Sequence, residues 1–215
     1  MTLEADLLAW LTPPKHAGRI FGVVIGVVTN NKDPDKLGRV KVKFPWLSDQ
    51  YESNWARITT AMAGNQRGFY WLPEIDDEVL VAFEHGQVEF PYLLGALWNG
   101  KDNPIEKNDD GKNNLRIIRS RSGHKITLDD ADGKEKIEIV DKSEKNKLII
   151  NTADHMITIV ADKDISITAT NGKLTLSGND IEINSKGDLK VDAKSSVTVK
   201  ATSQMTLKGS TININ

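Results

Sequence analysis

The chain contains 215 residues, 27% of them charged, with a formal net charge of −2 and no cysteine. This length allows one or two domains. No basic excess favours nucleic acid or an anionic membrane, and the lack of cysteine excludes disulfides, thiolate nucleophiles and cysteine-ligated zinc. No apolar run approaches the roughly 18 residues of a membrane span, and acids occupy the N-terminal positions where a signal peptide carries bases. We therefore expect a soluble product, assembled in the producing cell's cytoplasm without a signal peptide.

The composition changes near residue 104. All seven prolines lie at or before Pro104, and the five Trp, five Phe and three Tyr all lie at or before Trp98. Large rings belong in an irregular globular core, whereas a thin repetitive fibre has room only for smaller side chains. We therefore predict two domains, with these boundaries: an N-terminal segment at 1–17, a first domain at 18–100, a linker at 101–118 and a second domain at 119–215.

The N-terminal segment has the pattern of a short helix. Thr2 is suited to cap it, Pro13 and Pro14 would end it, and one face would carry Leu3, Leu7, Trp10 and Leu11. The face is short and has no basic flank, so we interpret it as a docking helix and not as a membrane anchor.

The first domain is predicted to be a small barrel of about five short strands. The candidate strands are segments 20–28, 39–44, 55–60, 78–84 and 90–97, and residues 30–36 are predicted to form a turn. Alternation in the second strand would turn Val40, Val42 and Phe44 toward a core. Short strands with Gly-rich turns are typical of a closed or partly open barrel such as an OB-fold.

Two other functions are alternatives for this barrel. Arg39, Lys41 and Lys43 on one strand raise nucleic-acid binding as an alternative, but nearby acids offset them and the aromatic residues fit core positions. The acids Glu74, Asp76, Asp77 and Glu78 are the candidate carboxylate pair of a glycosidase, but acids in a turn before a strand are usually only solvated. His16, His85, His124 and His155 are scattered, and Ser122-Gly123 lacks the nucleophile-elbow pattern. We predict no enzyme, no metal and no cofactor.

Pairs of apolar residues at positions i and i+2 recur through the last ninety residues. Eleven such pairs occur, and a polar residue separates the two members in ten of them. This alternation predicts strands with one buried face, and the short repeat predicts a winding β-structure. The first five pairs are Ile126/Leu128, Ile137/Ile139, Leu148/Ile150, Ile157/Ile159 and Ile165/Ile167. The other six are Leu174/Leu176, Ile181/Ile183, Leu189/Val191, Val197/Val199, Met205/Leu207 and Ile212/Ile214.

One such wound chain would be a poor core. Burying two aliphatic side chains stabilises by roughly 3–6 kcal/mol, whereas ordering eight residues costs about 8–16 kcal/mol before hydrogen bonds contribute. Copies wrapped around a common axis would bury the pairs and satisfy the strand edges. We therefore predict an all-β fold in which the barrel is followed by an intertwined triple-stranded β-helix, a homotrimer. Its predicted core consists of Ile165, Ile167, Leu174, Leu176, Ile181, Ile183, Leu189, Val191, Val197, Val199, Met205 and Leu207.

Four stretches resemble a known family. They are GRVKVKFPW at 38–46, LPEIDDEVLVAFEHG at 72–86, FPYLLGALWNG at 90–100 and RSRSGHKITLDD at 119–130. Together they resemble the contractile-tail spikes: phage baseplate assembly protein V, the phage cell-puncturing spike and the VgrG-type spike of type VI secretion and related injection particles. The resemblance implies a trimeric, rigid needle at the centre of a baseplate, part of a virion or injection particle, that penetrates a target envelope when a sheath contracts.

Departures from the family refine this expectation. Only about fifteen residues separate barrel and repeats, so no lysozyme domain is expected. The short N-terminal segment implies a separate baseplate hub protein, with the inner tube above it. The C-terminal residues carry no histidine-x-histidine iron site, which implies a PAAR-type tip protein on Thr211, Ile212, Asn213, Ile214 and Asn215. Contact with the target membrane would be transient. The alternative is a trimeric tail fibre that binds or cleaves surface polysaccharide, but no aromatic follows Trp98 to stack on sugars.

Overall fold

The computed structural model describes residues 18–214 and, within them, all side chains except that of Asp49. The chain divides into two units, residues 1–162 and 163–215, which are described separately below. The helix predicted in residues 1–17 lies outside the described residues. No helix among the described residues is long and apolar enough to cross a membrane.

Short strands build the first domain, as predicted. They are β1 (Val23–Asn30), β2 (Lys41–Phe44), β3 (Ser48–Glu52), β4 (Arg57–Ile58), β5 (Ala63–Gly64), β6 (Arg67–Gly68), β7 (Glu78–Phe83) and β8 (Pro91–Ala96). Six of them form one sheet in the order β3-β2-β1-β7-β8-β4, while β5 and β6 form a hairpin. All neighbours in the sheet are antiparallel except β4 and β8, which are parallel.

The core of this domain follows the predicted alternation. Val40 and Val42 are fully buried and Phe44 is nearly so, which confirms the inward face predicted for the second strand. These residues pack with their counterparts from the neighbouring strands, Val28, Val79, Val81, Phe83 and Leu93. The strand β7 alternates strictly between buried and half-buried residues, because one of its faces lines the core and the other lies outside it.

The aromatic residues differ from the prediction. Phe44 and Phe83 are buried and meet edge to face, with ring centroids 5.5 Å apart. Most other described rings lie at the surface, including Tyr51, Phe69, Tyr70, Trp71 and Trp98. Residues 69–71 follow the β5–β6 hairpin and precede β7, where the single chain supplies no second layer to cover them. The expectation that the rings fill the barrel core was therefore wrong for this segment.

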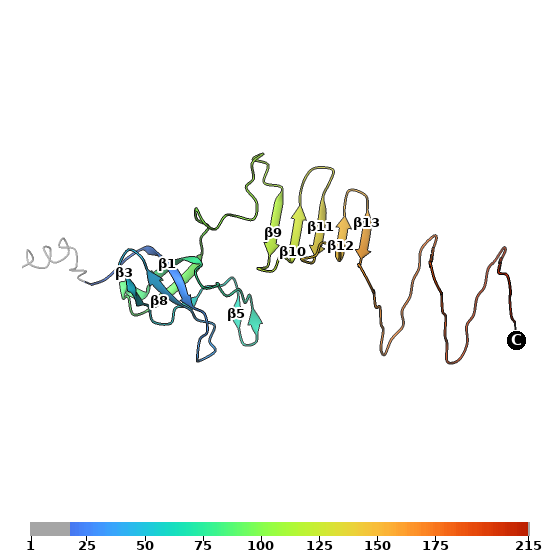
Figure 1. The fold of residues 1–215 in the computed structure, drawn as a ribbon, viewed down its shortest axis with the longest axis horizontal. Coiled ribbons are helices and arrows are strands. Elements are labelled where there is room, and N and C mark those ends of the chain that lie inside the picture. The colour runs from blue at the N-terminus through green and yellow to red at the C-terminus, as the bar shows by residue number, and fades with distance from the viewer. Residues whose placement is uncertain (1–17, 215) are drawn as a thin grey trace, which may run out of the picture. The chain divides into compact units, whose positions relative to one another are not determined.

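A second sheet follows the barrel (Figure 1). It contains β9 (Leu115–Arg119), β10 (Lys125–Asp129), β11 (Lys136–Val140), β12 (Lys147–Asn151) and β13 (Met156–Val160), joined in sequence order as an antiparallel meander. Strand β9 begins at Leu115, inside the segment expected to be a linker, because Ile117 and Ile118 pair with β10. The backbone hydrogen bonds of these five strands lie within one chain, unlike the winding predicted from residue 119.

Residues 163–214 contain no strand that pairs within the chain. The backbone consists of extended segments separated by bends near residues 170–172, 179, 186–187, 194–195 and 202–203 (Figure 1). These bends recur about every eight residues, at the same interval as the apolar pairs. We call each extended segment between two bends a leg.

Candidate functional site

The meander presents two rows of aliphatic side chains on one face. The first row crosses all five strands in register, through Ile118, Ile126, Ile139, Leu148 and Ile159. The second row lies two residues away along each strand and contains Leu128, Ile137, Ile150 and Ile157, with Arg116 at its β9 end. Residues two apart in a strand point to the same side, so both rows share one surface, which we call the aliphatic face.

The aliphatic face is the more exposed side of the sheet. Ile126, Leu128, Ile137 and Ile139 on the two inner strands are 38–46% exposed, and Ile157 and Ile159 on the last strand reach 68% and 60%. On the opposite face, Thr127 is only 5% exposed and Glu138 is half-buried beside Lys136, at 3.2 Å. A sheet with one wetted side normally turns its polar side to water. Here the arrangement is reversed, so the aliphatic face lacks a covering layer within the single chain.

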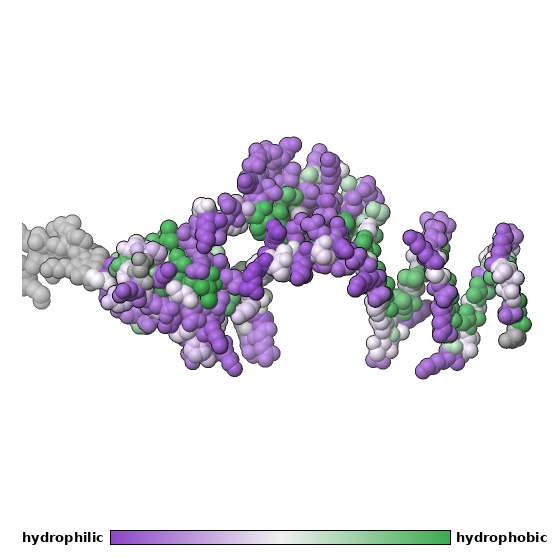
Figure 2. Space-filling model, in the orientation of Figure 1, coloured by the Kyte–Doolittle hydropathy of each residue, from purple (hydrophilic) through white to green (hydrophobic). Residues whose placement is uncertain are grey.

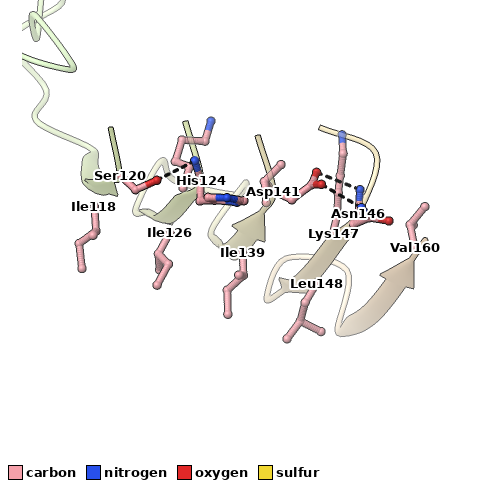
Figure 3. Close-up of a pocket in the computed structure, with 12 residues that line it drawn as sticks. Ile118, Ser120, His124, Ile126, Ile139, Asp141, Asn146, Lys147, Leu148 and Val160 are labelled. Carbon is pink, nitrogen blue, oxygen red and sulfur yellow. Dashed lines mark hydrogen bonds between the residues drawn. The ribbon is translucent and has the colours of Figure 1, made fainter. Parts of the chain in front are cut away.

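A shallow groove of about 590 Å³ lies at one end of the meander, where it is lined by four members of the first aliphatic row and by Lys125, Val140, Lys147 and Val160 of the opposite face. Figure 3 shows Ile118, Ile126, Ile139 and Leu148 projecting in the same direction from four neighbouring strands. Polar side chains of the turns border the groove at the strand ends, among them Ser120, His124, Asp141 and Asn146. Its apolar floor and polar border suit a covering layer of aliphatic side chains.

The bordering turns are held by side-chain hydrogen bonds. Asn146 and Ser143 donate hydrogen bonds to the carboxylate of Asp141, and these bonds lower the pKa of Asp141 to about 2. The next turn is connected to this one, because Asn146 Oδ1 accepts the backbone N–H of Asp162 at 3.1 Å. On the other side, His124 Nδ1 accepts the backbone N–H of Lys142 at 3.3 Å. These bonds fix the strand ends without using any group of the aliphatic face.

The apolar pairs of residues 163–214 are exposed throughout. All twelve predicted core residues, from Ile165 to Leu207, are 47–70% exposed in the single chain. Figure 2 shows hydrophobic residues at the surface of this segment among hydrophilic ones. The predicted tip residues continue the pattern, with Ile212 51% and Ile214 85% exposed, while Asn215 lies outside the described residues. The single chain therefore brings none of these residues together.

An Asp–Arg clasp in the barrel was not predicted from the sequence. The carboxylate of Asp33 receives Arg39 Nε at 2.9 Å and Arg39 Nη2 at 2.7 Å, and it also accepts backbone N–H groups of Asp35, Leu37 and Arg39. The guanidinium of Arg39 holds the pKa of the Asp33 carboxyl well below its usual range. The sequence signal for this clasp is the Asp-Pro-Asp turn followed by Gly-Arg, from which the sequence analysis predicts only a turn and a basic residue on a strand.

The clasp bears on the nucleic-acid alternative. Arg39 is bound by Asp33, and Lys41 is paired with Glu52 at 2.7 Å, where the ammonium also lowers the pKa of Glu52. Both cations also lie over the ring of Trp55, at 5.8 and 5.5 Å from its centroid. Two of the three bases proposed to contact phosphates are therefore occupied within the barrel.

Two of the acids considered for catalysis, Glu74 and Asp77, have structural partners. Asp77 accepts the backbone N–H of Glu74 at 2.8 Å, and Glu74 pairs with Arg121 at 2.9 Å. These acids lie in a turn before β7, where Asp76 has a positive φ of 74°. Within residues 18–214, no group of three or more His, Cys, Asp or Glu side chains is arranged to hold a metal ion.

Comparison with known proteins links this architecture to a family. Residues 24–98 match the type VI secretion system/phage-baseplate injector OB domain. The chain is 29% identical over 158 residues to the type VI secretion system spike protein VgrG1a of Pseudomonas aeruginosa. It is 26% identical over 162 residues to the spike protein VgrG3 of Vibrio cholerae, and 27% identical over 157 residues to the actin cross-linking toxin VgrG1 of Vibrio cholerae.

These alignments cover 67–72% of this chain but only 14–25% of each relative. The chain thus spans at most about a quarter of the length of these curated relatives. The matched barrel contains the buried alternation of β2 and β7, and the alignments extend over more residues than the barrel holds. The OB-domain match and the relatives together support a VgrG-like spike family for this chain.

Proposed function

We propose that this chain is the non-enzymatic central spike of a contractile injection apparatus, a homotrimer that pierces the target envelope when the sheath contracts. The observation that carries the proposal is the continuous exposure of aliphatic side chains from Ile118 to Ile214. Exposed apolar surfaces on this scale mark interaction sites. The similarity to spike proteins agrees with this proposal. A spike must be stiff along its length, and packing of these aliphatic side chains between copies would make it stiff.

Sister copies are the best cover for the aliphatic face. The apolar pairs recur at intervals of 7 to 11 residues through the meander and residues 163–214. A surface that covers them must therefore repeat at the same intervals, as a second copy of this chain does. Fully burying one such side chain stabilises by about 1.5–3 kcal/mol, and the half-exposed side chains would gain about half of that. Three copies are the smallest number that encloses an axial core of these aliphatic side chains. The apolar pairs would then form a dry interior, and the polar residues between them would face water.

The two regions would assemble differently. Residues 115–160 already satisfy their backbone ladders within one chain, so three such sheets would meet face to face as a prism. Residues 163–214 form no strand pair within the chain, so legs of other copies would lie between successive legs and complete the ladders. Because the strands of this second region are shared, pulling on one copy would require breaking hydrogen bonds to the others.

The ends of the spike would contact other components. We propose that a separate hub protein, with the inner tube above it, binds the barrel, and that a PAAR-type tip protein covers Thr211 to Asn215. Ile212 and Ile214 expose aliphatic surface at that end, which a tip protein would remove from water. Contact with the target membrane would be transient, and the particle would be assembled in the producing cell's cytoplasm.

The trimer can be tested by a matched pair of substitutions. Val197 is a predicted core residue, whereas the neighbouring Thr198 points to the opposite side of the same leg. In analytical ultracentrifugation we expect the wild type and Thr198→Asp to sediment as trimers. Val197→Asp would place three carboxylates on a dry axis and would block trimer formation. A wild-type chain that is a compact monomer at micromolar concentration would overturn the proposal, as would a stable Val197→Asp trimer.

A further inference from the structure

The outward side chains of the C-terminal legs carry a pattern of charge. Each leg presents three outward positions: one before the apolar pair, one between its members and one after it. The middle position holds Glu182 in one leg and Lys190 in the next, and the position after the pair holds Asp192 and then Lys200. Both steps are eight residues, the interval between the apolar pairs. At these two positions, consecutive legs therefore carry opposite charges.

One ion pair is already formed within a leg. Lys190 Nζ lies 2.7 Å from Asp192 Oδ2, and these two outward side chains are 81% and 74% exposed. In the leg before, Asn184 donates a hydrogen bond to Glu182 at 2.8 Å, so Glu182 is held on the same outward side as Asn184. Lys190 has further N–H donors, and Asp192 has a second carboxylate oxygen. Each can therefore bind a second partner from a neighbouring strand.

We infer that the copies of the spike are held in register by a charge network in which Glu182 of one copy contacts Lys190 of a second copy, and Asp192 of that second copy contacts Lys200 of the third. This inference rests on the proposed trimer. Successive legs of one chain do not pair with each other, so each leg must lie beside legs of other copies. If every copy moves to the next side of the bundle at each bend, the strand beside any leg is the following leg of a neighbouring copy.

The apolar core alone would specify this register poorly. Its pairs are nearly alike and equally spaced, so a slip by one leg still places aliphatic beside aliphatic. The charged residues distinguish the possible registers. We describe each register by its offset, which is the number of legs along the chain by which a leg and its neighbour in another copy differ. With no offset, each charged residue would face its own like-charged counterpart. With an offset of one leg, Asp164 faces Lys173, Lys173 faces Asp180, Glu182 faces Lys190 and Asp192 faces Lys200.

The offset of one leg also places like charges together at two positions. Asp180 would face Asp188, and Lys200 would face Lys208. Four opposite pairs against two like pairs still favour this offset over none, in which every charged pair is alike. An offset of two legs retains only two opposite pairs, Lys173 with Asp188 and Asp192 with Lys208, and it leaves Glu182 beside the uncharged Thr198. The charge pattern therefore favours an offset of one leg.

The absence of cysteine permits a direct test by disulfide trapping. Neighbouring strands lie about 4.8 Å apart, within the Cα separation of about 4.4–6.8 Å that a disulfide spans. We expect the double variant Glu182→Cys/Lys190→Cys, oxidised as a trimer, to run as a covalent trimer on non-reducing SDS gels. A bond within one chain would leave only monomer on the same gel.

Two matched variants report the other offsets. Glu182→Cys alone would form covalent dimers if identical legs were neighbours, and Glu182→Cys/Thr198→Cys would form covalent trimers if the offset were two legs. With an offset of one leg, residues 182 and 198 are separated by two strand spacings, about 9.6 Å, and should not be bridged. Asp192→Cys/Lys200→Cys is a second positive variant in case the first pair disturbs assembly.

Ultracentrifugation of the reduced proteins tests the proposed trimer independently of the charge network. A monomeric wild type would overturn the proposed function itself. A trimeric wild type in which either control variant becomes cross-linked, or in which neither positive variant does, would overturn only the charge network. The expected result is a trimer in all reduced samples and covalent trimers solely in the two positive variants.

Discussion

At the scale of single residues, the Asp33–Arg39 clasp organises the loop before β2. One carboxylate receives two guanidinium nitrogens and three backbone N–H groups, and its side chain is only 3% exposed. Sequence reasoning found the turn but not the clasp. Whether Arg39 faces solvent or its own loop depends on the positive φ values of Lys36 and Gly38, 57° and 71°, which reverse the chain. A pattern of alternating residues does not report such dihedral angles.

The clasp predicts how the barrel responds to acid. Arg39 holds the pKa of Asp33 below the value of 3.8 expected in the unfolded chain. A carboxyl with a depressed folded-state pKa stabilises above the unfolded value, and this contribution is lost as the pH falls below it. Asp33→Asn should therefore lower the urea midpoint at pH 7, and the gap to wild type should narrow below pH 3.8. Tryptophan fluorescence would measure the urea midpoint of the barrel, because every Trp lies at or before Trp98 and none lies in the repeat region.

The exposed Glu89 provides a control for this experiment. Glu89→Gln removes a carboxylate from the same domain without touching the clasp, so its midpoint should remain near that of wild type at pH 7. A gap between Asp33→Asn and wild type that does not change with pH would contradict the electrostatic explanation. It would point instead to a loss of packing.

Adjacent leucines on β8 give a test of the barrel core. Leu93 is 1% exposed and Leu94 is 41% exposed, so the two side chains face opposite sides. Leu93→Ala would leave a cavity in a packed core, which typically costs about 2–5 kcal/mol of unfolding free energy. Leu94→Ala should cost clearly less. Urea unfolding followed by tryptophan fluorescence would compare them, and equal losses would show that the core does not lie where the burial indicates.

At the scale of elements, the five predicted segments of the barrel correspond to β1, β2, β4, β7 and β8, whereas β3 was not predicted. The segments 39–44 and 78–84 correspond to β2 and β7, which bury every second residue. Strand β3 has the sequence SDQYE, with no alternation to detect. Strand β4 lies inside the predicted segment 55–60 but has only two residues, and its parallel pairing with β8 is a long-range contact that was not predicted. Strand β3 and the pairing of β4 with β8 form because neighbouring strands offer free hydrogen-bonding edges. This cause lies in the tertiary structure, so a local sequence pattern does not report it.

The repeats show a different limit of sequence reasoning. The spacing of apolar pairs predicted strands, and the strands β10 to β13 confirm it at the first four pairs. The intervals there are 11, 11 and 9 residues, long enough for a tight turn between antiparallel strands. After Asp162 the intervals fall to between 7 and 9 residues. Shorter connections leave less chain for a reversal, which agrees with the absence of strand pairing in residues 163–214.

Strand β13 offers a test of what covers the aliphatic face. Ile159 belongs to this face and is 60% exposed, while Thr158 lies on the opposite face. In a lone chain, Ile159→Lys would cost little because the side chain already meets water. In the proposed prism it would place three ammonium groups in an apolar interior and prevent assembly. We expect a trimer for Thr158→Lys and a loss of trimer for Ile159→Lys by ultracentrifugation; two equally trimeric variants would argue against a prism.

At the scale of the whole molecule, the barrel and the repeat region have different relations to their surroundings. The barrel has its own buried core and would fold around it in one copy. The C-terminal region has aliphatic side chains but no core of its own within one chain. The family resemblance could be found from the motifs of the barrel and of segment 119–130, since such motifs reflect local packing. The assembled needle could only be inferred, because its stabilising contacts lie between molecules.

The charge network makes a prediction that concerns the whole assembly. Lys200 and Lys208 are like-charged neighbours at an offset of one leg. Lys208→Glu would convert this contact into an opposite pair in each of three symmetric places. A cross-strand charge pair contributes roughly 0.2–1 kcal/mol, so the thermal midpoint of the trimer should rise by a few degrees. Circular dichroism in the far ultraviolet would follow the melting of the β-structure.

Salt and position provide the controls for this last prediction. The gain should shrink in 1 M NaCl, where the screening length is about 3 Å. Lys186→Glu makes the same charge change in a bend, where no outward position of a neighbouring leg faces it, and should leave the midpoint nearly unchanged. If Lys208→Glu lowers the midpoint while Lys186→Glu does not, the residue beside Lys208 is acidic. Asp192 would then be its neighbour, as an offset of two legs requires.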